Sequence, residues 1–364
     1  MAPRSDHQGP VESSSTTPYV MGGVDAPPSV NPNLVRRVRP GLPSVSVLLE
    51  SLLKGDRAVL SRAITLIEST RPADKALSGE LLDKALPFAG KSRRVGITGV
   101  PGVGKSTLIE ELGLHVLEDT SASLAVLAID PSSEGAHGSI LGDKSRMPRL
   151  ATHERAFIRP SPTSGSLGGV AHQTREAMLL CEAAGCTAVF VETVGVGQSE
   201  TSVRAMVDCF VLLVLAGAGD ELQGIKRGVM EMADLVAVTK SDGDNLNKAK
   251  LARHQVESAL HFFSAPEDGW SPPVLLTSAV ARTGVAELWT EIEKYLATME
   301  EGGWFQARRA DQAVAWMSDM VQRMILSRGM DKDGVLLRDR LEDDVRQGRI
   351  TPRHAAEAFM ERLG

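Results

Sequence analysis

The chain of 364 residues is longer than the roughly 250–300 residues that one domain usually reaches, so we expect one large domain with extensions, or two domains. Its 42% hydrophobic and 24% charged residues are typical of a globular protein with a core, and its net charge of −6 argues against nucleic acid as the main partner. Three cysteines exclude a disulfide framework, no CxxC or HExxH pattern offers a zinc site, and no apolar run is long enough for a membrane span, so we expect a cytoplasmic protein.

The first segment is rich in Ser, Pro, Gly and Thr and contains no apolar signal-peptide core. It buries too little apolar surface to offset the entropy of ordering. A helical pattern follows, in which Asp56 is placed to cap one helix and Asp74 to begin another, which Pro87 and Gly90 close. The expected organisation is a disordered tail (1–45), an N-terminal helical extension (46–90), a central domain (91–301) and a C-terminal helical arm (302–364).

A glycine-rich loop with the pattern GxxxxGK[ST] lies between the apolar strand Val95–Thr98 and a segment with helical periodicity. The glycines let successive backbone N–H groups turn toward a phosphate, and the amino end of the helix adds partial positive charge. We expect Lys105 to reach the β- and γ-phosphates and the Ser106 hydroxyl to hold Mg²⁺. The predicted phosphate-binding loop consists of Gly99, Val100, Pro101, Gly102, Val103, Gly104, Lys105, Ser106 and Thr107.

Apolar strands alternate with helical segments after this loop. This alternation predicts an α/β fold of the P-loop NTPase type, with a mostly parallel sheet covered by helices on both faces. Ligands of such sheets bind at the carboxyl ends of the strands, where polar residues occur in this chain. The predicted strands are Leu124–Ile129, Thr187–Val191, Phe210–Leu215, Leu235–Val238 and Val274–Leu276.

Two strand ends predict the base of the nucleotide. The sequence Thr239-Lys240-Ser241-Asp242 resembles the NKxD motif, in which the Asp carboxylate accepts hydrogen bonds from the N1–H and N2 amine of guanine. Adenine lacks this donor pair and would leave a buried carboxylate unpaired. The sequence Thr277-Ser278-Ala279 matches the SA motif, in which a backbone N–H contacts guanine O6. We therefore expect GTP and GDP as ligands, with Thr239 supplying a hydroxyl where Asn is usual.

The same edge of the predicted sheet carries candidate catalytic residues. Glu192 and Gly195 stand in the place of the DxxG motif, whose Gly N–H senses the γ-phosphate. Asp130 and Glu192 end neighbouring strands, so one can hold Mg²⁺, directly or through water, and the other can orient the attacking water. Arg146 belongs to a charged cluster that supplies transition-state charge when a partner orders it; the alternative is a solvated loop. The predicted catalytic set is Lys105, Asp130, Glu192 and Arg146, and the metal ligands are Ser106, Asp130 and Glu192.

Four further sequence blocks resemble the MeaB/ArgK family of GTPases, which includes the methylmalonic aciduria type A protein. The blocks are Asp130–Ser133, Gly138–Met147, Val191–Glu200 and Ala216–Gly228, and the similarity covers about residues 46–330. The resemblance implies switch I over Asp130–Met147, switch II over Glu192–Glu200 and a third switch over Ala216–Gly228.

The resemblance also implies a function. Family members are G-protein chaperones that bind an adenosylcobalamin-dependent acyl-CoA mutase, gate cofactor loading, and protect or reactivate the enzyme. Their GTP hydrolysis is slow alone and stimulated by the mutase, and they form homodimers through a C-terminal helical arm. The cobalamin adenosyltransferase is a further candidate partner. The chain lacks the DxHxxG cobalamin motif, so we do not expect it to bind cobalamin alone.

The predicted arm carries an apolar stripe at helical spacing between Ala313 and Ile325, and we expect this stripe to form a core shared with a second subunit. Two other functions stay open at this point. One is a P-loop kinase of the amino-acid transport type, which would require a phosphate acceptor pocket. The other is a nucleotide-gated binding protein whose hydrolysis is incidental. Methylmalonyl-CoA mutase or a related mutase is the expected client.

Overall fold

The computed structural model describes residues 43–130, 146–162, 167–193, 199–215, 227–263, 268–328, 330 and 332–362. The chain divides into two units, Met1–Pro43 and Ser44–Gly364, and the described secondary structure belongs to the second unit. The predicted tail up to residue 42 lies outside the described residues, as do Gly195 and most of the predicted switch I and third switch segments.

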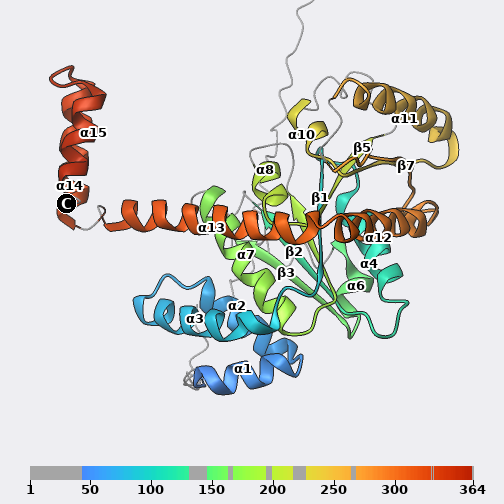
Figure 1. The fold of residues 1–364 in the computed structure, drawn as a ribbon, viewed down its shortest axis with the longest axis horizontal. Coiled ribbons are helices and arrows are strands. Elements are labelled where there is room, and N and C mark those ends of the chain that lie inside the picture. Colours follow the sequence, from blue (N-terminus) through green and yellow to red (C-terminus); the bar gives the residue numbers. More distant parts are fainter. Residues whose placement is uncertain are drawn as a thin grey trace, which may run out of the picture. The chain divides into compact units, whose positions relative to one another are not determined.

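A parallel sheet forms the centre of the described structure (Figure 1). Its strand order is β3-β2-β4-β1-β5-β6-β7, and each pairing is parallel, which confirms the predicted fold class. The strands are β1 (Arg93–Gly99), β2 (Leu124–Asp130), β3 (Ala156–Pro162), β4 (Ala188–Thr193), β5 (Cys209–Leu215), β6 (Leu235–Thr239) and β7 (Val274–Leu276).

Strand β3 is absent from the strands predicted from the sequence. It contains Pro160 and Pro162, and Arg159 interrupts its apolar run. Proline has no N–H to donate to a sheet ladder, so it is tolerated mainly in edge strands. Among the described strands, β3 lies at the edge of the sheet and pairs with β2 alone, which explains why its prolines are compatible with the sheet.

Helices cover both faces of the sheet, because alternate residues of each strand point to opposite faces (Figure 1). In β2, Leu124 and Val126 belong to one buried cluster, whereas Ala125 and Leu127 belong to the other. Helices α4 and α12 pack into the first cluster, and α1, α2, α3, α7 and α11 pack into the second. The helices named here are α1 (Val45–Leu53), α2 (Arg57–Ile67), α3 (Pro72–Ala85), α4 (Lys105–Val116), α7 (Leu167–Ala183), α11 (Leu246–Leu260) and α12 (Val285–Glu301).

The remaining described helices are shorter or belong to the C-terminal part. They are η1 (Leu86–Phe88), α6 (Pro148–Thr152), α8 (Ser199–Arg204), α10 (Arg227–Glu231), η2 (Gly243–Asn245), α13 (Trp304–Arg328), α14 (Lys332–Arg346) and α15 (Pro352–Glu361). None of the helices in the described ranges combines the length and the apolar character that a bilayer span requires.

The N-terminal helices follow local capping rules. Asp56 caps α2 as predicted, since its carboxylate accepts hydrogen bonds from the N–H groups of Ala58 and Val59 at 2.8 and 3.1 Å. The prediction that Asp74 begins the next helix is wrong by two residues. Helix α3 begins at Pro72, because proline is well suited to the first turn of a helix.

Helix α13 is anchored to the sheet domain by polar contacts near its amino end. Arg309 donates hydrogen bonds at 2.7 Å to both carboxylate oxygens of Asp208, and its NH2 group also donates to the Ser92 carbonyl. Gln312 donates from Nε2 to the Val207 carbonyl at 2.8 Å. The loop between α8 and β5 therefore holds the first turns of α13, while α14 and α15 pack against each other.

Candidate nucleotide-binding site

The glycine-rich loop joins the central strand β1 to helix α4, as its motif requires. Gly102 and Gly104 have φ angles of +78° and +99°, which are strained for residues with a Cβ atom. A Cβ atom at Gly99 would lie 2.7 Å from the Leu213 carbonyl oxygen of β5. The loop can therefore keep this path only with glycine at these positions, and it delivers the chain to the amino end of α4, where anions are stabilised.

Lys105 and Ser106, the first residues of α4, both point toward this loop and its neighbour strand. The Lys105 ammonium donates hydrogen bonds to the carbonyls of Gly99 (2.8 Å) and Val100 (3.2 Å). Burial lowers the pKa of Lys105, the carboxylate of Glu192 opposes this, and the charge of Arg146 lowers it further. The structure thus brings Lys105, Glu192 and Arg146, which lie far apart in the sequence, into electrostatic contact.

Glu192 lies next to the Ser106 side chain. The Ser106 hydroxyl donates to Glu192 Oε1 at 3.0 Å, and Glu192 is buried. Strands β2 and β4 are neighbours, and Ala128 of β2 is aligned with Glu192 of β4. Asp130, the last residue of β2, therefore lies on the strand next to Glu192, but its side chain is not among those that the structure describes. Hydroxyl and carboxylate oxygens suit Mg²⁺, which keeps water and phosphate ligands and rarely needs a protein-only cage. Accordingly, no cluster of three His, Cys, Asp or Glu side chains among the described residues forms a metal site by itself.

A contact between two threonines beside the site was not anticipated from the sequence. The Thr193 hydroxyl donates to Thr98 Oγ1 at 2.8 Å, and both side chains are buried. This bond joins β4, which carries Glu192, to β1, which leads into the glycine loop. The available signal was a pair of threonines in otherwise apolar strands, but their contact depends on the strand order.

The predicted base-recognition residues also lie together. The Ser278 hydroxyl donates to Asp242 Oδ2 at 2.8 Å and accepts a hydrogen bond from the Ala281 N–H at 3.0 Å. The Ser241 N–H donates to the Thr277 carbonyl at 3.0 Å, which joins the two segments that follow β6 and β7. Ser278 therefore has a side-chain role, orienting the Asp242 carboxylate, in addition to the backbone role expected for its segment with Ala279.

Thr239 connects the base-recognition segment to the phosphate loop. Its hydroxyl is buried and donates to the Val103 carbonyl at 2.8 Å. The next residue, Lys240, has a φ angle of +54°, in the left-handed region that few non-glycine residues adopt. The threonine at the position of the usual Asn thus retains a direct tie between the end of β6 and the P-loop.

Comparison with known proteins identifies the family. A family model described as methylmalonyl Co-A mutase-associated GTPase MeaB matches residues 60–333. The chain belongs to this family of GTPases. It is 51% identical to a probable GTPase of Mycobacterium tuberculosis over 319 residues, which cover 87% of this chain and 95% of the relative. It is 49% identical to the GTPase ArgK of Escherichia coli over 279 residues, which cover 77% of this chain and 84% of the relative.

Two further comparisons extend this result. The mitochondrial methylmalonic aciduria type A homolog of Caenorhabditis elegans is 45% identical over 329 residues, which cover 87% of this chain and 82% of the relative. A crystal structure described as an LAO/AO transport system kinase matches with a TM-score of 0.70 and 38% identity, covering 88% of this chain and 97% of that one. The sequence relatives and the matched crystal structure therefore both support the family assignment, and the matched structure supports the predicted fold.

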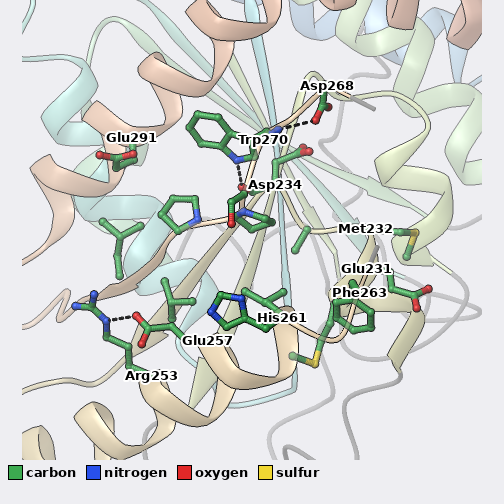
Figure 2. A pocket seen from close by; sticks show the side chains of 18 of the residues that line it. Glu231, Met232, Asp234, Arg253, Glu257, His261, Phe263, Asp268, Trp270 and Glu291 are labelled. Carbon is green, nitrogen blue, oxygen red and sulfur yellow. Dashed lines mark hydrogen bonds and ion pairs between the residues drawn. The ribbon is translucent and has the colours of Figure 1, made fainter. Parts of the chain in front are cut away.

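A cavity of about 1040 Å³ lies elsewhere on this MeaB-family chain, beside the edge strand β7 (Figure 2). Glu257 of α11 and His261, which directly follows this helix, line it. Trp270 lines it too, and its indole N–H donates to the Asp234 carbonyl at 2.8 Å. Asp234 directly precedes β6, so this part of the cavity is at the amino ends of the strands. The predicted nucleotide residues that the structure describes lie at the carboxyl ends, and none of these lines the cavity, so we do not assign it to the nucleotide.

Proposed function

We propose that this GTPase binds GTP and Mg²⁺ at the carboxyl ends of β1, β2, β4 and β6 and serves as a G-protein chaperone of an adenosylcobalamin-dependent acyl-CoA mutase. In this role it would gate cofactor loading and protect or reactivate the mutase. The observation that carries the nucleotide assignment is the contact of Thr239 with Val103, because it fixes the base-recognition segment to a P-loop that also holds Lys105.

The residues fit a phosphoryl-transfer site in which positioning and charge do the chemistry. Lys105 leaves the carbonyls of Gly99 and Val100 to contact the β- and γ-phosphates. Bound Mg²⁺, held by Ser106 and by Asp130 or Glu192, would neutralise phosphate charge. Of these two carboxylates, the one that does not hold the metal orients the attacking water. Arg146, which is near enough to affect the pKa of Lys105, adds positive charge at the transferred phosphoryl group.

The base is selected by Asp242, which Ser278 orients. The substitution Asp242→Asn exchanges an acceptor for a donor, so we expect the preference to shift from GTP to XTP by at least tenfold. Calorimetry with both nucleotides checks this, and Asp244→Asn, on the neighbouring 3-10 turn, is a matched control. If the Asp242→Asn protein binds both GTP and XTP as tightly as the wild type binds GTP, the base assignment is contradicted.

The mutase assignment rests on the names of similar proteins. The matching family model describes mutase-associated GTPases, and the Caenorhabditis elegans relative is named for methylmalonic aciduria. Purified methylmalonyl-CoA mutase should accelerate GTP hydrolysis by the full chain and co-purify with it in the presence of a non-hydrolysable GTP analogue. Unchanged hydrolysis and no co-purification would contradict this client; the same assay with related mutases and with the cobalamin adenosyltransferase would identify another.

We further infer a homodimer that forms through α13. Val314, Met317, Val321 and Ile325 leave an exposed apolar face on this helix, with side chains 43–60% exposed. Contiguous apolar surface of this kind marks interaction sites, and a second copy offers the same stripe. A cytoplasmic location also belongs to this proposal, since the three cysteines are free thiols.

One alternative has a specific observation in its favour. The matched crystal structure with a TM-score of 0.70 is described as a transport system kinase. Incubation with γ-labelled GTP, alone and with the mutase, distinguishes the two functions. Release of free phosphate supports the GTPase, whereas stable label on a protein supports the kinase.

A further inference from the structure

Arg175 of α7 is a buried arginine with few hydrogen-bond acceptors. Only 7% of the Arg175 surface is exposed to solvent. NH1 and NH2 each lie 3.4 Å from an acceptor, Asp319 Oδ2 and the Ala205 carbonyl respectively, and Asp319 is itself more than half exposed. Its Nε has no hydrogen-bond partner among the described residues. Buried polar groups normally find partners, and a charged one costs most when it does not, so this guanidinium is poorly compensated.

Arg175 lines a cavity of about 210 Å³ whose wall comes from α7, α8 and α13. Two further donors there are Ser202 of α8 and Trp316 of α13, and the indole Nε1 of Trp316 is buried without a partner in the described structure. Burial lowers the pKa of Arg175, Asp319 opposes this, and Arg323, which also lines the cavity, lowers the pKa further. Against these two cations the described residues of the wall include one carboxylate, Asp319, so positive charge exceeds negative charge among them.

We propose that this cavity binds a small oxyanion, a carboxylate or a phosphate, which bridges α7, α8 and α13. A guanidinium presents parallel N–H donors that match an oxyanion. Arg323, Ser202 and Trp316, whose buried indole N–H has no partner in the described structure, line the same cavity. The cavity is below the size of usual pockets for drug-sized ligands, roughly 300–1,000 Å³, which favours a small anion over a nucleotide.

A second cavity shows why the anion belongs on this side. Arg175 and Trp316 also line a space of about 250 Å³, whose wall includes Arg94, Arg309, Glu182 and Gln312. Arg94 donates to the Glu182 carboxylate and Arg309 to that of Asp208, whereas Gln312 Oε1 has no partner among the described residues. Because these two arginines already have carboxylate partners and an acceptor nearby lacks a donor, water suits this space better than an anion. The 210 Å³ cavity has Ser202 and Arg323 in their place.

The bridged helices give the site a structural consequence. Helix α8 follows the segment that contains Gly195, predicted to sense the γ-phosphate, and α13 begins the arm. An anion held by Arg175, Ser202 and Arg323 would fasten these two helices together. Binding should therefore stabilise the folded chain, in proportion to the anion concentration.

The test is titration of the full chain, saturated with GDP so that its P-loop is filled, with sodium phosphate and separately with sodium acetate at constant ionic strength. Calorimetry and the melting temperature report binding. We expect saturable binding of at least one anion, weakened about tenfold or more in Arg175→Gln and several-fold in Trp316→Phe, which keeps an aromatic side chain but removes the indole N–H. The matched control is Arg353→Gln on α15, an exposed arginine paired with Glu357, which should bind like the wild type.

The two titrations also separate the sources of the anion, since saturation by phosphate alone indicates a phosphoryl ligand and saturation by acetate a carboxylate. Unaltered GDP affinity shows that each variant is folded. If Arg175→Gln fails this check, it is replaced by Arg175→Lys, which keeps the positive charge but lacks the parallel N–H donors of the guanidinium. No saturable binding by the wild type overturns the proposal and leaves water as the occupant. Binding that is equal in Arg175→Gln and the wild type shows an adventitious ion only and also overturns it.

Discussion

Helices α12 and α13 follow each other in the chain and carry apolar stripes of similar period, but the described part of the chain buries the stripe of α12 and leaves that of α13 exposed. In α12, the apolar side chains of Leu288, Ile292 and Leu296 are buried against the sheet and α4. In α13, Val321 and Ile325 are 47% and 43% exposed. The two helices are separated by Gly302 and Gly303, and Phe305 at the start of α13 still packs against the buried cluster, whereas Val321 and Ile325 do not belong to it.

This difference teaches that amphipathic periodicity identifies a face but not its partner. The stripe of α12 completes the core of one nucleotide domain, whereas that of α13 is available to another molecule. Polar contacts fix α13 instead, chiefly Arg309 with Asp208 and Gln312 with Val207. Substitutions in the two helices should therefore affect different properties of the protein.

The largest expected effect on stability is that of Ile292→Ala in α12. Ile292 is fully buried, so truncation removes buried methyl groups and leaves a cavity, lowering the free energy of unfolding by about 2–5 kcal/mol. The matched substitution Ile325→Ala in α13 should cost less than about 0.5 kcal/mol when the protein is dilute enough to be monomeric. Urea denaturation checks both, and equal costs in the monomer would break the distinction between the two helices.

A second large effect separates hydrolysis from assembly. Lys105→Ala removes the ammonium group expected at the β- and γ-phosphates, so GTP hydrolysis should fall about 10²–10³-fold, the usual cost of one such donor. Sedimentation should show wild-type assembly, because Lys105 is far in sequence from α13 and packs on Gly99 and Val100. Lys294→Ala on α12, an exposed lysine, is the control and should retain hydrolysis.

Much of this architecture could be predicted from the sequence. The glycine loop, the apolar strands and the order of motifs predicted a parallel P-loop fold, but β3 was missed because Pro160 and Pro162 are not typical of a strand. The NKxD-like motif indicates that Thr239 supplies a hydroxyl where the usual Asn ties the base-recognition segment to the P-loop, but the acceptor of this hydroxyl, the Val103 carbonyl 136 positions away, could not be predicted. The surroundings of Arg175 were equally inaccessible, because they depend on how α7, α8 and α13 pack.

The substitution Val321→Asp in α13 tests the opposite case to Lys105→Ala, a loss of assembly with hydrolysis retained. A carboxylate on this exposed face is tolerated in a monomer but would be buried without a partner between two copies. We expect the dimer to dissociate at least about tenfold more readily, with intrinsic GTP hydrolysis per chain unchanged. Analytical ultracentrifugation over a range of concentrations measures this, and Asp333→Asn, an exposed change at the start of α14, should have no effect. If the Val321→Asp protein dimerises as strongly as the wild type, another surface holds the two copies together.

The smallest expected effect concerns the tie between the two halves of the nucleotide site. Thr239→Val keeps the side-chain shape and removes the hydroxyl, which leaves the buried Val103 carbonyl without this donor and should weaken GDP binding by about 1 kcal/mol, roughly five- to tenfold. Thr239→Ser, which keeps the hydroxyl, should retain most of the affinity. Calorimetry at the same magnesium concentration compares the three proteins. If Thr239→Val binds GDP as the wild type does, the base-recognition segment is held to the P-loop by the neighbouring strands rather than by this hydroxyl. If Thr239→Asn binds more tightly than the wild type, the amide adds a contact to the site that the hydroxyl does not supply.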